Sequence, residues 1–188
     1  MKSRQIRIIG GDWRGRKLSV IDAAGLRPTP DRIRETLFNW LAAKCRSATV
    51  LDCFAGSGAL GLEAMSRGAS ALVACEKHPQ VVDNLRTQVQ RLGSDAIEII
   101  AGDVQDSIDR FEQTFDIVFI DPPYAHPEMR ARVLLQLEAR QCLREASVIY
   151  FEWPQSQIFA LPSANLHWLK QKKAGQVHYA IAEWRFSG

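Results

Sequence analysis

Four acidic residues recur along the chain, each at the end of a short apolar run. They are Asp52, Glu76, Asp103 and Asp121. Carboxylates can accept hydrogen bonds from hydroxyls and amines, and they favour a positively charged ligand. The carboxyl ends of parallel strands meet at one edge of a sheet, where such sheets bind their ligands. The pattern therefore predicts one binding site for a cationic ligand that is rich in hydrogen-bond donors.

A glycine-rich loop follows Asp52. Gly56, Gly58 and Gly61 satisfy the spacing G-x-G-x-x-G, and Glu76 lies near the place where a dinucleotide-binding fold carries its ribose carboxylate. A nicotinamide-dependent enzyme is therefore one interpretation, although the chain lacks a second mononucleotide-binding half and Asp103 would be unexplained. A tight turn between strand and helix, with no ligand, is another.

S-adenosylmethionine would make better use of these acidic groups than a pyrophosphate, because it carries an ammonium and a cationic sulfur. We expect Glu76 to accept both ribose hydroxyls and Asp103 to accept the adenine amine, beside the backbone of Val104. For either carboxylate alone, a helix cap or a solvated loop charge is the plainer interpretation. The expected cofactor site comprises Asp52, Phe54, Gly56, Ser57, Gly58, Glu76, Lys77, Asp103, Val104 and Asp121.

The segment Asp121-Pro122-Pro123-Tyr124 follows the apolar run 115–120. Its two prolines fix φ and remove two backbone donors, so the loop is stiff and presents acceptors. Asp121 and the Pro122 carbonyl could accept both protons of a base amine and so favour a pyramidal nitrogen. Tyr124 could stack on the base, worth about 1–3 kcal/mol. These three residues predict in-line methyl transfer by positioning and electrostatics, without a metal; a rigid proline turn is the structural alternative.

The elements that position these residues alternate from residue 48 onward. Nearly continuous apolar runs predict buried parallel strands, and the segments between them have helical spacing. The predicted strands are 48–53, 70–75, 96–101, 115–120 and 147–152, and the predicted helices are 59–67, 79–92, 104–112 and 127–143. Two further runs, 165–172 and 177–186, predict an antiparallel hairpin. The fold class is α/β: a Rossmann-like, mostly parallel seven-stranded sheet with this C-terminal hairpin.

The N-terminal part differs from this pattern. Residues 6–20 predict a β-hairpin, and the next helix is expected to begin with Thr29 as its cap and Pro30 at its first position. Its apolar residues recur at helical spacing to about Lys44. A length of 188 residues fits one domain with a small appendage. We therefore expect an N-terminal extension, 1–45, and a catalytic domain, 46–188.

The net charge of +3 hides a marked asymmetry. Residues 1–44 hold ten Lys or Arg against four Asp or Glu, whereas the rest hold fourteen against seventeen. This predicts a basic arm that faces a polyanion, with an ordinary solvated face as the alternative.

Cysteine usage and hydropathy limit the surroundings of the protein. Cys45, Cys53, Cys75 and Cys142 have neither the spacing of a zinc site nor that of a disulfide framework. No apolar run approaches the ~20 residues of a membrane span, and the first residues lack a signal peptide's apolar stretch. We expect a cytoplasmic protein with reduced thiols, without metal or membrane.

The chain resembles the class I S-adenosylmethionine-dependent methyltransferases, and more narrowly the bacterial 16S ribosomal RNA guanine-N2 methyltransferase D (RsmD-like) family. The resemblance covers nearly the whole chain and rests on Arg7–Leu18, Leu26–Trp40, Leu51–Gly68 and Phe115–Tyr124. The two N-terminal segments discriminate, because the D-P-P-Y motif also occurs in DNA adenine-N6 enzymes. Tyr124 stands where the family often has Phe, and Cys53 where Leu is usual.

The resemblance implies methylation of the N2 amine of guanine 966 in 16S ribosomal RNA. It also implies action on an assembled or nearly assembled small subunit, and we expect the protein to be a monomer. The basic arm then becomes an RNA contact, and Trp13 could either stack on a base or pack beneath the hairpin. The expected RNA-binding residues are Arg4, Arg7, Trp13, Arg14, Arg16, Lys17, Arg27, Thr29 and Arg32. A DNA adenine-N6 methyltransferase and a non-catalytic RNA-binding protein remain alternatives.

Overall fold

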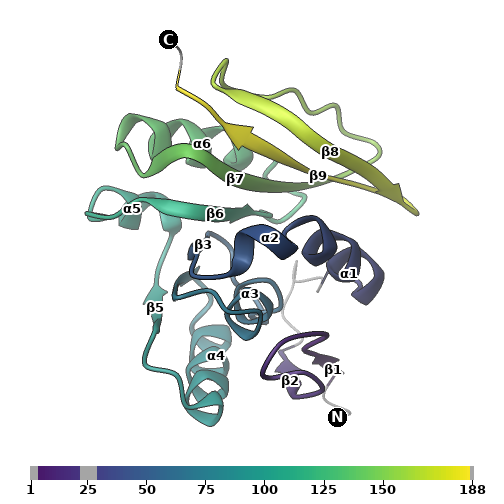
Figure 1. Cartoon of the computed structure of the whole chain (residues 1–188), viewed down its shortest axis with the longest axis vertical. Coiled ribbons are helices and arrows are strands. Elements are labelled where there is room, and N and C mark those ends of the chain that lie inside the picture. Colours follow the sequence, from purple (N-terminus) through teal and green to yellow (C-terminus); the bar gives the residue numbers. More distant parts are fainter. Residues whose placement is uncertain (1–3, 22–28, 187–188) are drawn as a thin grey trace.

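A seven-stranded sheet forms the centre of the molecule, whose computed structural model describes residues 4–21 and 29–186 (Figure 1). The strand order is β5-β4-β3-β6-β7-β9-β8. The first five strands in this order pair in parallel, whereas β9 is antiparallel to β7 and β8. The strands are β3 (Thr49–Asp52), β4 (Ala71–Glu76), β5 (Ile97–Ala101), β6 (Phe115–Ile120), β7 (Leu143–Pro154), β8 (Leu166–Ala174) and β9 (Val177–Trp184). The predicted Rossmann-like sheet with its antiparallel terminal hairpin is confirmed.

The strand order reverses between β3 and β6. The chain first builds outward from β3 through β4 to β5, then returns to pair β6 with β3 and continues to β7. The crossovers are made by α3 (Gly61–Ser66), α4 (Pro79–Leu92), α5 (Val104–Ile108) and α6 (Met129–Ala139). Ligands of such sheets bind at the carboxyl ends of the strands beside the reversal. A ligand site is therefore expected at the residues that follow Asp52 and Ile120.

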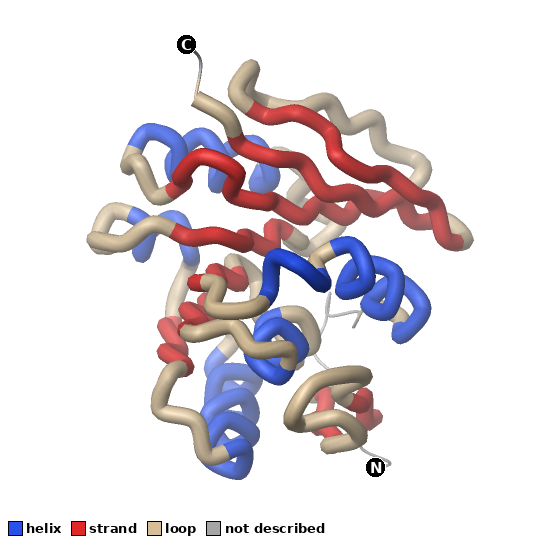
Figure 2. The backbone as a smooth tube through the Cα atoms, in the orientation of Figure 1, coloured by secondary structure: helices blue, strands red, loops and turns tan. Residues whose placement is uncertain are grey.

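Both faces of the central strands are buried, which explains why their sequences are nearly continuously apolar. In β6, Ile117 and Phe119 join one core layer, and Val118 and Ile120 join the other. Figure 2 follows the sheet as a band of red strands from the terminal hairpin to β5, with blue helices outside it.

The predicted boundaries are confirmed where the periodicity is clean and differ where a helix end is set by local backbone. β6 and α4 match the predictions 115–120 and 79–92. α6 ends at Ala139, earlier than predicted, because the chain turns at Gln141 (φ 54°) and enters β7 at Leu143. Ala146 (φ 64°) lies where the pairing of β6 with β7 shifts register.

The predicted cap of the first long helix is wrong. α1 (Asp31–Trp40) has Pro30 as its N-cap, with ψ 146°, and no side chain caps it. Pro30 is thus outside the helix, and Thr29 lies one residue too early for its hydroxyl to serve as the cap. The helix also breaks at Leu41, before the short α2 (Ala42–Cys45).

The N-terminal hairpin pairs β1 (Arg4–Arg7) with β2 (Lys17–Val20). Ile6, Ile8 and Leu18 are buried in the same core cluster as Leu37 of α1 and Val50 of β3. The extension therefore shares apolar core with the sheet, while the division of the chain at residue 45 stays a prediction.

All four cysteines are buried and unpaired. Cys45 belongs to the core layer beneath α1 and α2, and Cys53, Cys75 and Cys142 belong to the opposite layer. Burial raises the pKa of Cys45 to about 11 and that of Cys75 to about 12. It also raises the pKa values of Cys53 and Cys142.

Within 4–21 and 29–186, no helix is both long and apolar enough to span a membrane. Those residues also contain no cluster of three or more His, Cys, Asp or Glu side chains that could hold a metal ion.

Candidate active site

A cavity of about 620 Å³ opens at the carboxyl ends of β3, β4, β5 and β6. It gathers residues from four successive strand ends, as the sequence predicts. Of the predicted cofactor and catalytic residues, those that line it are Asp52, Phe54, Gly56, Ser57, Glu76, Lys77, Asp103, Val104, Asp121, Pro122 and Tyr124.

Gly58 is the predicted cofactor residue that does not line the cavity. It adopts φ +78°, and a Cβ built on it would lie 2.7 Å from Leu85 and 2.8 Å from Leu62. The position requires glycine because the loop turns here against the packed side chains of α3 and α4. Gly58 therefore determines the backbone conformation of the loop without facing the cavity.

Glu76 is held in place by the loop that faces it. One carboxylate oxygen accepts from the Gly56 N–H at 2.9 Å, and the other accepts from the His78 N–H at 2.8 Å. Each carboxylate oxygen has two acceptor positions, so both can still accept from a vicinal diol. The side chain is fixed in orientation before any ligand arrives.

Asp52 is a buried carboxyl group that organises the start of α3. Its side chain accepts from the Gly61 N–H at 3.0 Å. Burial raises the pKa of Asp52 to about 7, and the nearby Glu76 adds to this, while hydrogen bonds from Gly61 and Phe54 oppose it. A cationic ligand in the cavity would favour the ionised form.

Asp103 combines the two roles that the sequence left open. Its side chain accepts from the Gln105 N–H at 3.1 Å and thereby caps α5, and the residue also lines the cavity. The cap fixes the carboxylate at the end of β5.

Asp121 lies where the cavity meets the proline loop. Burial raises the pKa of Asp121 well above its ordinary value, and the carboxylates of Glu152 and Asp52 raise it further. The guanidinium of Arg130 has the opposite effect on it. A carboxylate of raised pKa is a stronger proton acceptor, which suits a group that holds the protons of an amine.

Sequence reasoning missed the residues that support this loop. Glu152 is buried at the end of β7 and accepts from the hydroxyls of Tyr124, at 2.7 Å, and Tyr150, at 2.9 Å. Gln157 donates to the Tyr124 carbonyl at 3.0 Å, and buried Arg130 donates to Gln157. The signal for Glu152 was present, because it ends the fifth parallel strand as the other acids end the first four.

A buried carboxylate joins the N-terminal extension to the body. Glu63 of α3 accepts from the N–H groups of Ile9, at 2.7 Å, and Gly10, at 2.8 Å. It also pairs with Arg67 at 2.8 Å and with buried Arg34 at 3.6 Å. The charged residues of the extension are therefore partly structural.

The structure separates the predicted RNA-binding residues into two groups. Thr29 lines the cavity, and Arg32 is exposed on the first turn of α1. Arg7, Arg14, Arg16 and Lys17 are exposed on the hairpin, and Trp13 is half-buried against the core. The side chain of Arg4 and all of Arg27 lie outside the described residues.

The hairpin turn is distant from the cavity. Arg16 donates to the carbonyl of Arg91, in the last turn of α4, whose first residue Pro79 lines the cavity. Twelve residues of helix span about 18 Å. The turn and the cavity therefore lie toward opposite ends of α4.

Comparisons with known proteins agree with this arrangement. A family model described as conserved hypothetical protein 95 matches residues 6–183. Ribosomal RNA small subunit methyltransferase D of Escherichia coli (strain K12) is 41% identical over 188 residues, which cover 99% of this chain and 93% of that protein. The protein of the same name from Haemophilus influenzae is 39% identical over 184 residues, 94% of this chain and 93% of its own. The solved structure of yhhF from Escherichia coli has a TM-score of 0.89 at 37% identity, over 98% of this chain and 100% of that one.

Proposed function

Since this chain belongs to the conserved hypothetical protein 95 family, which it shares with ribosomal RNA small subunit methyltransferase D, we propose that it methylates ribosomal RNA of the small subunit. The methyl donor is S-adenosylmethionine, and the acceptor is the exocyclic N2 amine of one guanine. The observation that carries the proposal is that Glu76, Asp103, Asp121 and Tyr124 line one and the same cavity.

The residues of the cavity fit this donor. Glu76 offers two oriented carboxylate oxygens for the ribose hydroxyls, and Asp103 offers an acceptor for the adenine amine. Burial raises the pKa of Asp52, so a positively charged ligand nearby would stabilise its ionised form. When bound, S-adenosylmethionine supplies an electrophilic methyl group on a cationic sulfur.

The proline loop prepares the nucleophile. Asp121 and the Pro122 carbonyl accept the two amine protons, so that the nitrogen lone pair points at the incoming carbon. Tyr124 bounds the cavity on this side, and its bond to Glu152 fixes the plane on which the guanine stacks. Once methylated, the nitrogen would carry one proton too many, and the Asp121 carboxylate is suited to take it. No covalent enzyme intermediate is needed.

The finer assignments follow from the family resemblance. We place the target at guanine 966 of 16S ribosomal RNA. The enzyme acts as a monomer, in the cytoplasm, on an assembled or nearly assembled small subunit.

The deciding experiment uses small-subunit particles from cells that lack this activity. We expect the purified protein to incorporate one methyl per particle, and mass spectrometry of nuclease fragments to find it on N2 of guanine 966. Methyl incorporation into duplex DNA and none into the particles would instead favour a DNA adenine-N6 methyltransferase. RNA binding without methyl transfer to any substrate would leave a non-catalytic RNA-binding protein.

A further inference from the structure

A row of lysines runs along the free edge of the sheet, at the end where the cavity opens. Lys170, Lys172 and Lys173 of β8 are all exposed. The exposed Arg32 and the half-buried Trp40 lie on α1, which packs beside this hairpin. We call these five residues the hairpin-edge surface. None of them is among the predicted RNA contacts except Arg32.

Strand register ties this surface to the cavity. Tyr179 of β9 is paired with Glu152 on one side and with Lys172 on the other. Glu152 lines the cavity. Neighbouring strands lie about 4.8 Å apart, so the Cα atom of Lys172 lies about 10 Å from that of Glu152. The lysines therefore lie at the same carboxyl-end edge of the sheet as the cavity, two strands beyond Glu152.

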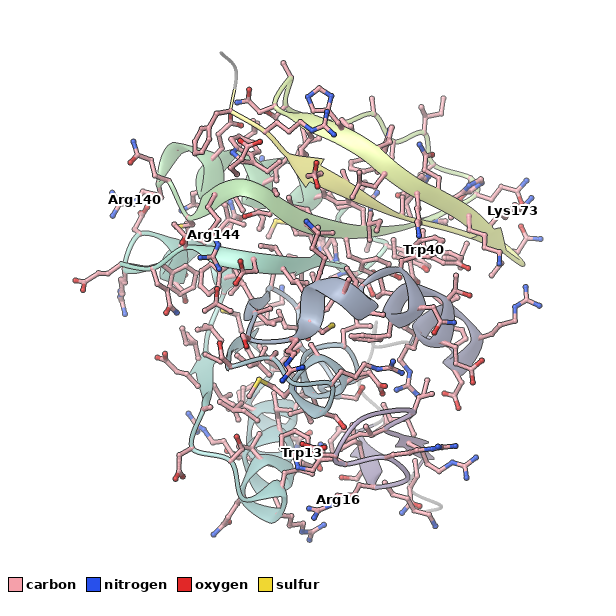
Figure 3. All side chains as sticks on the ribbon, viewed as in Figure 1. Trp13, Arg16, Trp40, Arg140, Arg144 and Lys173 are labelled. Atoms are coloured by element: carbon pink, nitrogen blue, oxygen red, sulfur yellow. The ribbon has the colours of Figure 1, made fainter. Side chains whose placement is uncertain are left out.

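An aromatic ring lies between the cavity and the lysines. Trp40 stacks on Tyr179 with ring centroids 5.4 Å apart and planes at 21°. Its stack fixes the indole, and its exposed part offers a flat face to a nucleotide base. Figure 3 shows Trp40 beside the sheet and Lys173 near the tip of the terminal hairpin.

The three lysines of this surface, Lys170, Lys172 and Lys173, take part in no ion pair within 4.0 Å among residues 4–21 and 29–186. Lysines on an edge strand can serve to prevent edge-to-edge aggregation. The lysines occupy the second half of β8, whereas its first half reads Leu166-His167-Trp168-Leu169, so the charge is concentrated at the end of the strand nearer the cavity.

The hairpin turn at the N-terminus cannot take this position. Arg16 contacts the far end of α4, about 18 Å along the helix from the cavity lining. In Figure 3, Trp13 and Arg16 lie toward one end of the molecule, away from Trp40 and Lys173. The turn of the hairpin is therefore distant from the reacting base, and it is the other end of the hairpin, at Val20, that lines the cavity.

We propose that the hairpin-edge surface binds the single-stranded ribosomal RNA that flanks the target base. The lysines and Arg32 contact its phosphates, and Trp40 stacks on a neighbouring base. This proposal rests on the proposed function, because the RNA must enter the cavity through the same mouth.

The test compares the removal of three positive charges from the hairpin-edge surface with the removal of three positive charges elsewhere. One variant carries Lys170→Gln, Lys172→Gln and Lys173→Gln. The matched control carries Arg86→Gln, Arg110→Gln and Arg132→Gln, three exposed cations elsewhere on the surface. A third variant with Lys170→Glu, Lys172→Glu and Lys173→Glu keeps the strand edge charged, so aggregation of the first variant would not leave the question open.

Each protein is titrated with a short single-stranded RNA across a range of salt concentrations, and its affinity for S-adenosylhomocysteine is measured by calorimetry. Three lost phosphate contacts should lower the slope of log affinity against log salt by about 2, and weaken binding about tenfold at low salt. Both lysine variants should show this, with unchanged S-adenosylhomocysteine affinity, and the arginine control should not.

The outcomes separate this proposal from the proposed function. A wild-type protein that methylates no ribosomal RNA would overturn the proposed function itself. If the wild type is active but the lysine variants match the arginine control in salt slope and affinity, the hairpin-edge surface does not bind RNA. Lost methylation of particles with unchanged affinity for free RNA would assign the surface to an acidic protein partner and overturn the proposal.

Discussion

The hydroxyl of Tyr124 donates a 2.7 Å hydrogen bond to the carboxylate of buried Glu152. This bond connects the proline loop after β6 to the end of β7, its neighbour in the sheet. Gln157 also donates to the backbone carbonyl of Tyr124. Tyr124 is therefore held by hydrogen bonds at both its backbone and its hydroxyl group.

Tyr124→Phe should reduce kcat/KM for methyl transfer about fivefold, the equivalent of one hydrogen bond of about 1 kcal/mol. Tyr124→Ala should reduce it by a further factor of about 5 to 150, because base stacking is worth about 1–3 kcal/mol. Steady-state kinetics on small-subunit particles measures both. Equal losses in the two variants would mean that the hydroxyl, and not the ring, carries the effect.

Asp121→Ala should abolish methyl transfer, by at least about a hundredfold, because it removes an acceptor at the reacting amine. Binding of S-adenosylmethionine should stay near normal, and calorimetry measures it directly. Asp121→Asn keeps an acceptor oxygen but cannot take a proton, so its methyl-transfer rate should lie between those of the wild type and Asp121→Ala. Lost cofactor affinity in Asp121→Ala would instead assign this carboxylate to the cofactor.

Asp52 should make the protein less stable as the pH rises from about 4 to about 7. Burial raises the pKa of Asp52 from 3.8 to about 7, so the folded state holds a proton that the unfolded state has lost. This contribution to stability is complete below the unfolded pKa and is lost as the pH rises through the folded pKa. Melting temperatures at pH 5 and pH 7.5 should differ less in Asp52→Asn than in the wild type. The exposed Asp83→Asn serves as control, and an unchanged difference in Asp52→Asn would contradict the prediction.

Glu63→Gln should destabilise the fold by about 3 kcal/mol, because it leaves two guanidinium groups beside a neutral side chain in a buried site. For a chain of this size that corresponds to a melting temperature lower by roughly 6–12 °C. Glu35→Gln, on the exposed side of α1, gives the matched control. If the two variants have the same melting temperature, the Glu63 carboxylate does not hold the extension to the body.

Replacement of Arg14, Arg16 and Lys17 by Gln should weaken RNA binding and lower the slope of log affinity against log salt by about 2. The turnover rate at saturating RNA should be retained, since the hairpin turn lies far from the cavity. Binding titrations and saturation kinetics measure the two effects separately. An unchanged salt slope would refute a phosphate role for these three residues.

Local chemistry was enough to predict much of the fold and the positions of the cavity acids. α4 was predicted to the residue because Pro79 begins it, Gly93 ends it at φ 69°, and its apolar stripe is uninterrupted. Asp52, Glu76, Asp103 and Asp121 converge because parallel strands end at one edge. These features depend on short stretches of chain or on a general property of the sheet.

Features that depend on contacts between distant segments could not be predicted from the sequence. The pairing of Arg34 with Glu63 joins residues 29 positions apart, and it turns a cation of the basic arm into a buried structural group. Arg16 lies far from the cavity because it contacts Arg91, in the last turn of α4, whereas the first residue of that helix lines the cavity. The pairing of Lys172, Tyr179 and Glu152 likewise follows from strand register, which the sequence does not specify.

The reactivity of the four buried thiols can be used to follow how the protein unfolds. Alkylating reagents attack the thiolate, and both burial and the raised pKa values suppress it in the native state. Cys45 becomes reactive when the layer beneath α1 and α2 opens, and Cys142 when the opposite layer opens. The order in which these two cysteines are labelled during gradual denaturation therefore records which face of the sheet loosens first.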